Sequence, residues 1–340
     1  MDHKFSALTL PQELCGNTDT SVYAVPNWTV AQSTADTGGV ATLLRRCLMY
    51  RAPLLDRVWS KIVNLAGFTS KFIGTDRARL HILEGAGKGQ LPTIVFVHGI
   101  GANAASFALA MHQLKADFRH LIAIDLPGHG LSPPLAVAQD HMSTFAEAAA
   151  TLRLYLNEPI YIYGNSLGGA FALAFAERFP ELVLGVILSS PVGAPMDQAE
   201  LADFVQRLSF STLRQAREFA AKLTDRMPMI VAWIMAPFIR NIFASVTIRT
   251  ILSRFSPDHY VHPQQLAALK MPLLMLWGKE DRLMPNGQFE YFLKHLPAHA
   301  QVLRPSGFSH CPHLDHPTRV ALSIRTFAKQ ATQMSLNEAA

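Results

Sequence analysis

A serine lies between two glycines in the segment 161–169, which reads Tyr-Ile-Tyr-Gly-Asn-Ser-Leu-Gly-Gly. An apolar run typical of a strand precedes this Gly-x-Ser-x-Gly motif, and an Ala- and Phe-rich run typical of a helix follows it. A sharp strand-to-helix turn would lift the Ser166 hydroxyl clear of a sheet, and its crowded backbone would require Gly164 and Gly168. We interpret Ser166 as a candidate nucleophile; the alternative is a glycine-rich turn in a non-catalytic protein.

A second loop of small residues, 98–102, also follows an apolar, strand-like run. The tetrahedral intermediates of acyl transfer need two backbone N–H donors directed at the oxyanion. We assign one donor to Leu167, the residue after the candidate nucleophile, and the other to Ile100 in this loop. His98 is interpreted as a hydrogen-bonding residue that shapes the loop, and Asp125, at the end of the next strand, as the organiser of a turn.

A serine nucleophile needs a base, usually a histidine that a carboxylate orients. The sequence has 14 histidines, so residue type alone does not identify the base. His310, His313 and His316 cluster in the segment 306–317, where they also suggest metal ligands. Two prolines argue against a single helical face there, and no acidic or cysteine cluster accompanies the histidines. We therefore predict no metal, and the chemistry requires no cofactor.

From residue 72 onward, short apolar segments alternate with helix-like segments. Most of the apolar segments are continuous runs, as expected for strands that are covered on both faces. The expected strands are 80–83, 93–98, 121–125, 159–164, 184–188, 272–277 and 301–303, and helical patterns lie at 107–115, 142–156 and 167–178. This order predicts an α/β fold with a mostly parallel central sheet flanked by helices.

The alternation stops between residues 191 and 269, where the sequence is helix-like throughout. Candidate helices lie at 199–208, 213–227 and 230–245, and we interpret this all-helical insertion as a cap. We divide the chain into an N-terminal segment 1–70, partly disordered and then an amphipathic helix, an α/β core formed by 71–192 and 269–332, a helical cap at 193–268 and a tail at 333–340.

Five motifs follow one another over roughly residues 70 to 330. They are His98-Gly-Ile-Gly, Asp125-Leu-Pro-Gly-His-Gly, Gly164-Asn-Ser-Leu-Gly-Gly, Trp277-Gly-Lys-Glu-Asp and Ser309-His-Cys-Pro. In this order they resemble the capped α/β-hydrolase superfamily, and within it esterases and enzymes of the monoacylglycerol lipase type. The resemblance implies the α/β-hydrolase fold, and the N-terminal 70 residues fall outside it.

The resemblance also selects an acid and a base, because the chain order in this fold is nucleophile, acid, histidine. Similar proteins carry the acid in the loop after the strand 272–277, at the position of Asp281, with Glu280 one residue away. The family pattern places the base at His310, just before the start of the final helix, and His313 is the alternative. Ser309 stands where similar proteins usually have glycine.

The candidate cap contains an apolar stretch, 227–243, that is rich in Met, Ile and aromatic residues. Such side chains form an adaptable lining for an acyl chain. We therefore name as candidate substrate contacts Met229, Trp233, Met235 and Phe238. The alternative is that they pack the cap onto the core. No cluster of charges in the cap indicates a charged substrate, so the expected small-molecule partner is a hydrophobic ester.

Composition and charge indicate which other classes of partner are expected. Apolar residues make up 49% of the chain and charged residues 16%, and the net charge of +5 is not gathered in long basic runs, so no nucleic-acid partner is predicted. The cysteines and the lack of export signals bear on the location of the protein. Three widely spaced cysteines favour a reducing compartment. Because we find neither a secretory signal nor a membrane-spanning segment, we expect a cytoplasmic protein.

Residues 41–66 form a basic amphipathic pattern that either packs on the protein body or contacts a membrane surface peripherally. The oligomeric state is not indicated.

The sequence thus predicts a serine hydrolase that cleaves carboxylic esters with a hydrophobic acyl group through an acyl-enzyme intermediate. The same scaffold also supports the cleavage of thioesters and carbon–carbon bonds. An acyltransferase would instead pass the acyl group to an alcohol. A non-catalytic ligand receptor is the alternative outside the enzymes.

Overall fold

The computed structural model describes residues 63, 67–75, 78–134 and 141–338 of the 340-residue chain. Nearly all of the predicted N-terminal segment 1–70, and with it the stretch 41–66 considered for membrane contact, lies outside the described residues. The structural account below concerns the described residues alone.

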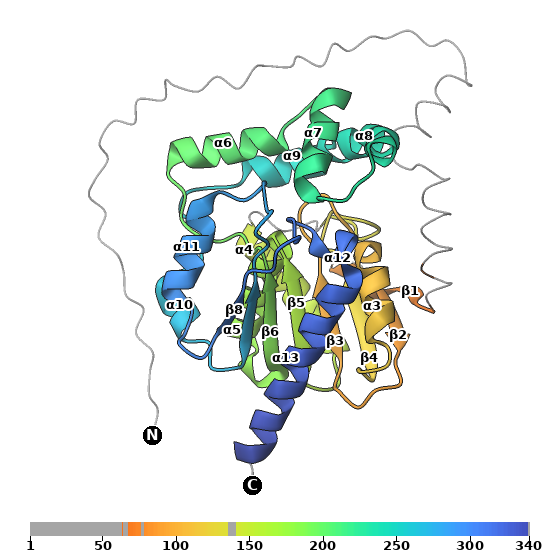
Figure 1. Ribbon diagram of the computed structural model, residues 1–340, viewed down its shortest axis with the longest axis vertical. Coiled ribbons are helices and arrows are strands. Elements are labelled where there is room, and N and C mark those ends of the chain that lie inside the picture. The colour runs from red at the N-terminus through yellow and green to blue at the C-terminus, as the bar shows by residue number, and fades with distance from the viewer. Residues whose placement is uncertain (1–62, 64–66, 76–77, 135–140, 339–340) are drawn as a thin grey trace, which may run out of the picture. The chain divides into compact units, whose positions relative to one another are not determined.

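An eight-stranded sheet forms the centre of the described region, in the order β1-β2-β4-β3-β5-β6-β7-β8 (Figure 1). The pairs β1–β2 and β2–β4 are antiparallel, and every other neighbouring pair is parallel. The strands are β1 Thr69–Gly74, β2 Arg79–Ala86, β3 Ile94–Val97, β4 His120–Ile124, β5 Ile160–Asn165, β6 Val183–Ser189, β7 Leu273–Leu276 and β8 Gln301–Leu303. The prediction of a mostly parallel sheet is confirmed.

The middle strands are buried throughout, which explains their continuous apolar sequences. Every residue of β3, β5 and β7 is buried, whereas β1 has one buried residue, Ile73. The sequence prediction missed β1 for this reason, because an edge strand with one buried side chain carries no apolar run. Since β3, β5, β6 and β7 are parallel neighbours, the loops that leave their carboxyl ends meet at one edge of the sheet.

Helices cover both faces of the sheet (Figure 1). One apolar core includes residues of α4 and α5, and a second includes residues of α3 and α13. The helices of the core region are η1 Ala104–Phe107, α3 Ala108–Leu114, α4 His141–Tyr155, α5 Leu167–Arg178, η2 Pro180–Leu182, α11 Asn286–His295, α12 Pro312–Asp315 and α13 Pro317–Glu338. The boundary that we set at residue 332 falls inside α13, so the residues from 333 to 338, predicted as a tail, continue this helix.

Five helices of the described chain lie between β6 and β7, where the sequence is helix-like. They are α6 Gln198–Leu208, α7 Leu213–Leu223, α8 Met229–Phe243, α9 Val246–Ser253 and α10 Pro263–Ala267. Capping boxes begin α6, through Asp197 and Glu200, and α7, through Thr212 and Gln215. The insertion contacts the loops after β3 and β4, because a Cβ atom on Gly101 would lie 2.6 Å from the Phe243 ring and one on Gly128 would lie 2.5 Å from Thr247.

Candidate active site

Ser166 occupies a strained turn between β5 and α5. Its backbone has φ 55° and ψ −118°, in a region that L-residues rarely adopt. The turn is packed so tightly that a Cβ atom on Gly164 would lie 2.2 Å from the Gly168 carbonyl oxygen. A Cβ atom on Gly168 would lie 2.1 Å from the carbonyl oxygen of Val97 in the neighbouring strand. Both glycines are therefore sterically required, as the motif predicts.

His310 and Asp281 come from different loops and meet in a buried hydrogen bond. His310 Nδ1 lies 2.9 Å from Asp281 Oδ2, and both side chains are almost completely shielded from solvent. The second carboxylate oxygen, Oδ1, accepts the N–H groups of Leu283 at 2.9 Å and Met284 at 3.1 Å. Burial alone would raise the pKa of Asp281, but the neighbouring His310 and these hydrogen bonds hold that pKa below its usual value. The carboxylate is thus ionised and oriented toward one nitrogen of the histidine.

Asn165 joins the loop of His310 to the turn of Ser166. Its side-chain amide donates to the carbonyl oxygens of His310 at 2.9 Å and Ser189 at 3.1 Å. Sequence reasoning did not find this role, because the residue between the motif's first glycine and its serine carries no signal of its own.

Within the described residues Ser166 Oγ itself makes no hydrogen bond. Hydrogen bonds between a serine and its base commonly tighten when a substrate binds.

Ser309, which replaces the usual glycine, ties the His310 loop to the helical insertion. The Ser309 hydroxyl lies 2.9 Å from the Leu223 carbonyl oxygen and 2.7 Å from Asp315 Oδ2. The Cys311 N–H donates to the same Leu223 oxygen at 2.8 Å. Because Leu223 is the last residue of α7, the two residues that flank His310 are both anchored to the end of an insertion helix.

The two proposed oxyanion donors lie in loops that contact the serine. Leu167 is the first residue of α5, where an N–H has no acceptor within the helix. The loop of Ile100 passes so close that a Cβ atom on Gly99 would be 3.5 Å from Ser166 Oγ. His98 shapes this loop: its Nδ1 donates to the Gly99 carbonyl oxygen at 2.7 Å, and its Nε2 accepts the Leu126 N–H at 3.1 Å.

The alternative site residues have other roles. His313 packs against Phe107, with ring centroids 4.5 Å apart, and burial lowers the pKa of His313 to about 3. Glu280 accepts the Gly307 N–H at 2.7 Å. Burial, together with the nearby Asp281 and Asp315 carboxylates, raises the pKa of the Cys311 thiol. His313, Glu280 and Cys311 therefore take no part in the hydrogen bond between His310 and Asp281.

A second set of the same residue types comes from β1, β2 and the end of β4. Ser70 Oγ and His81 Nε2 are 2.7 Å apart, and His81 Nδ1 is 2.7 Å from Asp125 Oδ2. Asp125 also accepts the N–H groups of Ala104 at 2.6 Å and Leu131 at 2.8 Å, which fixes two loops, as the turn motif predicts. We call Ser70, His81 and Asp125 the Ser70 set, and Ser166, His310 and Asp281 the Ser166 set.

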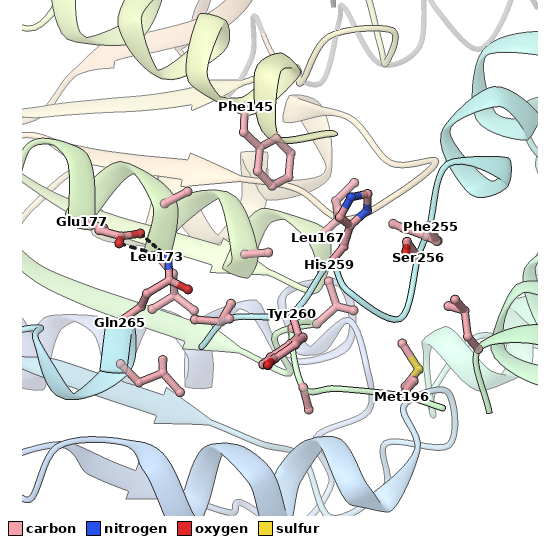
Figure 2. Close-up of a pocket in the computed structure, with 18 of the residues that line it drawn as sticks. Phe145, Leu167, Leu173, Glu177, Met196, Phe255, Ser256, His259, Tyr260 and Gln265 are labelled. Atoms are coloured by element: carbon pink, nitrogen blue, oxygen red, sulfur yellow. Dashed lines mark hydrogen bonds between the residues drawn. The ribbon is translucent and has the colours of Figure 1, made fainter. Parts of the chain in front are cut away.

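A large apolar pocket begins beside Leu167 and extends along α5 (Figure 2). It encloses about 930 Å³ of space, part of it open to solvent. The helix contributes one face, formed by Leu167, Ala170, Leu173, Ala174 and Glu177. The insertion and the loops next to it contribute a second group, which includes Met196, Leu201, Phe204, Phe255 and Tyr260. Glu177 accepts hydrogen bonds from the Gln265 amide at 2.9 and 3.0 Å, so the end of the pocket farthest along α5 is polar.

The structure assigns the lining of this pocket to residues other than those named from the sequence. Met229, Trp233, Met235 and Phe238 are absent from the lining, and Met229 and Trp233 are exposed to solvent. Apolar composition suggested that α8 would face the substrate, but composition does not state which side of the insertion a helix occupies. The lining comes mainly from α5, α6 and the α9–α10 connection instead.

Comparisons with known proteins agree with this geometry. Residues 94–322 match the model of the alpha/beta hydrolase family. A pimeloyl-[acyl-carrier protein] methyl ester esterase from Xanthomonas campestris pv. campestris is 28% identical over 258 residues, which cover 70% of this chain and 96% of that protein. Two solved structures share the fold: a bacterial membrane phospholipase A (TM-score 0.71, 23% identity, 86% of this chain and 96% of that one) and carboxylesterase CesB from Bacillus subtilis (TM-score 0.62, 20% identity, 79% and 96%). The family match confirms the resemblance seen in the sequence motifs, and the chain belongs to the α/β hydrolase family.

Proposed function

We propose that this chain is a serine carboxylic ester hydrolase that uses the Ser166 set as its catalytic triad. The observation that carries the proposal is the arrangement at the carboxyl ends of β5 and β7. A serine at φ 55° there adjoins a buried Asp281–His310 pair, and Asn165 bonds to the backbone of His310. Family membership and the similarity to a methyl ester esterase support ester chemistry.

In the proposed reaction the Ser166 hydroxyl attacks the carbonyl carbon of the ester while His310 Nε2 accepts the hydroxyl proton. Asp281 holds Nδ1 protonated and stabilises the imidazolium that forms. The N–H groups of Leu167 and Ile100 bind the oxyanion of the tetrahedral intermediate. His310 then protonates the departing alcohol, and a water molecule, deprotonated by the same histidine, releases the carboxylic acid from the acyl-enzyme.

The pocket along α5 supports a substrate with a medium-length apolar acyl chain. Ten residues separate Leu167 from Glu177, which corresponds to about 15 Å along the helix, close to the length of an extended dodecanoyl chain. The lining between these two residues is apolar, and such surfaces favour alkyl chains. The Glu177 carboxylate at the polar end disfavours a substrate whose acyl chain ends in a second carboxylate, because like charges would meet there.

The test is hydrolysis of p-nitrophenyl esters from acetyl to palmitoyl by the wild type and by Ser166→Ala. We expect the rate to peak near the decanoyl and dodecanoyl esters and to vanish in the variant. A folded wild-type protein that hydrolyses none of these esters would contradict the proposal and favour thioester or carbon–carbon cleavage, or a receptor. Formation of a new ester in the presence of added alcohol would instead identify an acyltransferase.

A further inference from the structure

Most apolar side chains of α8 face solvent. Met229 is 77% exposed, Ile230 67% and Ile234 56%, and Trp233 and Ile242 are exposed as well, whereas Ala236 and Phe243 are buried. We call the exposed group, Met229, Ile230, Trp233, Ile234 and Ile242, the α8 face. Single exposed apolar residues are common, but a contiguous group on one helix marks an interaction surface.

The charge around the α8 face is positive. The Arg217 guanidinium lies 3.6 Å from the centre of the Trp233 ring, Arg240 is the one charged residue of α8, and Arg226 lies just before that helix. The acidic residues between 213 and 254 are Glu218 and Asp225, and both are paired, with Arg214 and Arg282 respectively. A partner for this surface should therefore be apolar inside and negatively charged at its boundary.

The geometry excludes α8 and α9 as a membrane span. Among the described residues no single helix is long and apolar enough to cross a bilayer; only α8 and α9 together reach that length and composition, with a bend of 63°. The apolar side chains Ile248 and Leu252 of α9 are buried in the protein core. The 15 residues of α8 alone extend about 22 Å, which is short of the roughly 30 Å of a hydrocarbon core.

We propose that the α8 face docks this protein on the surface of a lipid bilayer that contains anionic lipids. The side chains of the α8 face enter the boundary between headgroups and acyl chains, where tryptophan is favoured, and Arg217, Arg226 and Arg240 contact the anionic headgroups. The opposite end of α8 reaches the candidate active site, because Phe243 packs on Gly101, next to the proposed oxyanion donor Ile100. Docking in this way brings the site close to apolar esters dissolved in the membrane.

The experiment measures co-sedimentation of the full chain with vesicles of phosphatidylcholine alone and of phosphatidylcholine mixed with phosphatidylglycerol. The test variant is Ile230→Asp/Ile234→Asp, and the matched control is Leu154→Asp/Leu322→Asp, which adds the same charges at apolar residues that are 85% and 55% exposed on α4 and α13. We expect the wild type and the control to bind the mixed vesicles, with at least about a tenfold loss of binding in the test variant. High salt should weaken the binding only in part, since the apolar contacts remain.

Each contrary result has a separate meaning. Equal vesicle binding by the test variant and the wild type would overturn the proposal, as would a wild type that binds neither vesicle. Sedimentation that shows a wild-type dimer and a monomeric test variant would assign the α8 face to a second copy of the chain instead. Far-ultraviolet circular dichroism and thermal unfolding report whether each variant is folded, and Ser166→Ala should bind vesicles like the wild type, so this test does not depend on the proposed catalytic role.

Discussion

The Ser70 set and the Ser166 set contain the same three residue types, and in each a buried histidine bonds to a buried aspartate. The hydrogen bond to the serine is present in the Ser70 set, at 2.7 Å. However, Ser70 lies in a regular strand, where it pairs with Leu83, whereas Ser166 lies in a strained turn at the start of a helix. The large pocket borders Leu167, next to Ser166, and Ser70 is not part of its lining.

We propose that the difference between the two serines lies in their surroundings and not in the hydrogen bonds among the three side chains. In the proposed reaction the surroundings of Ser166 would supply backbone donors, a helix N-terminus and space for an acyl chain. The surroundings of Asp125 supply further backbone hydrogen bonds that fix the loops after β3 and β4. We therefore assign the Ser70 set to stability and the Ser166 set to chemistry.

The largest expected effect separates the two serines. Ser166→Ala should lower kcat by roughly a millionfold, because the nucleophile is lost, while Ser70→Ala should leave kcat within about twofold of the wild type. Initial rates on a decanoyl ester and labelling with a fluorophosphonate probe measure this difference. Probe labelling that disappears in Ser70→Ala and persists in Ser166→Ala would reverse the assignment.

The two neighbouring carboxylates of the β7 loop provide the next test. Asp281→Asn replaces the carboxylate with a neutral amide, which no longer stabilises an imidazolium and can hold His310 in the wrong tautomer, so kcat should fall by about ten-thousandfold with a smaller change in KM. The matched control is Glu280→Gln. Glu280 accepts a hydrogen bond from the Gly307 N–H and not from a histidine, so the loss of kcat in this control should remain below about tenfold. A similar loss in both variants would indicate damage to the loop in place of a specific role for Asp281.

For Asp125 the expected effect falls on stability. Asp125→Asn disturbs a buried pair and should lower the free energy of unfolding by about 2–3 kcal/mol, with less than about a tenfold change in kcat. Burial raises the pKa of Asp125, but the hydrogen bonds from His81 and the Ala104 N–H outweigh it, so the pKa is lowered in the folded state. The resulting stabilisation is present above the unfolded pKa of about 4 and is lost as the pH falls below it. Urea unfolding at pH 7 and pH 3.5 should therefore show a smaller pH dependence in Asp125→Asn than in the wild type.

The smallest expected effect concerns the pocket. Ala174→Phe places a ring in the channel along α5 and should lower kcat/KM for the dodecanoyl ester by about tenfold relative to the acetyl ester. The control Leu154→Phe changes an exposed side chain of α4 and should leave this ratio unchanged. An unchanged ratio in Ala174→Phe would place the acyl chain elsewhere.

Sequence reasoning predicted the parallel sheet and its order of strands and helices, because the buried strands carry unbroken apolar runs and the motifs lie at their ends. The sequence motifs also named Asp281 and His310, whose side chains are hydrogen-bonded in the structure, and Ser166, which lies in the turn between β5 and α5. The hydrogen bonds of Asn165 to His310 and of Ser309 to Leu223 were not predictable, because they join loops that are 145 and 86 residues apart in the sequence.

The contacts within the Ser70 set were also not predictable from the sequence. Ser70 lies on the edge strand β1 and His81 on its antiparallel neighbour β2. Their sequences have no distinctive motif, and their contact follows from the register of the two strands. Met229, Trp233, Met235 and Phe238, which we named as candidate substrate contacts, lie outside the pocket lining for a different reason, since apolar side chains give the same sequence pattern whether they line a pocket or face solvent. In both cases the missing information is the position of an element relative to its neighbours.

The two hydrogen bonds from Ser309 and Cys311 to the Leu223 carbonyl oxygen have a consequence for motion. A rigid-body opening of the whole insertion would pull the end of α7 away and displace the loop that carries His310. We therefore expect α7 and α9 to remain fixed during turnover and the movement that admits substrate to be confined to α8, with its hinge near Pro228. In amide hydrogen exchange, α8 should open faster than α7, so that the general base keeps its alignment while the entrance opens.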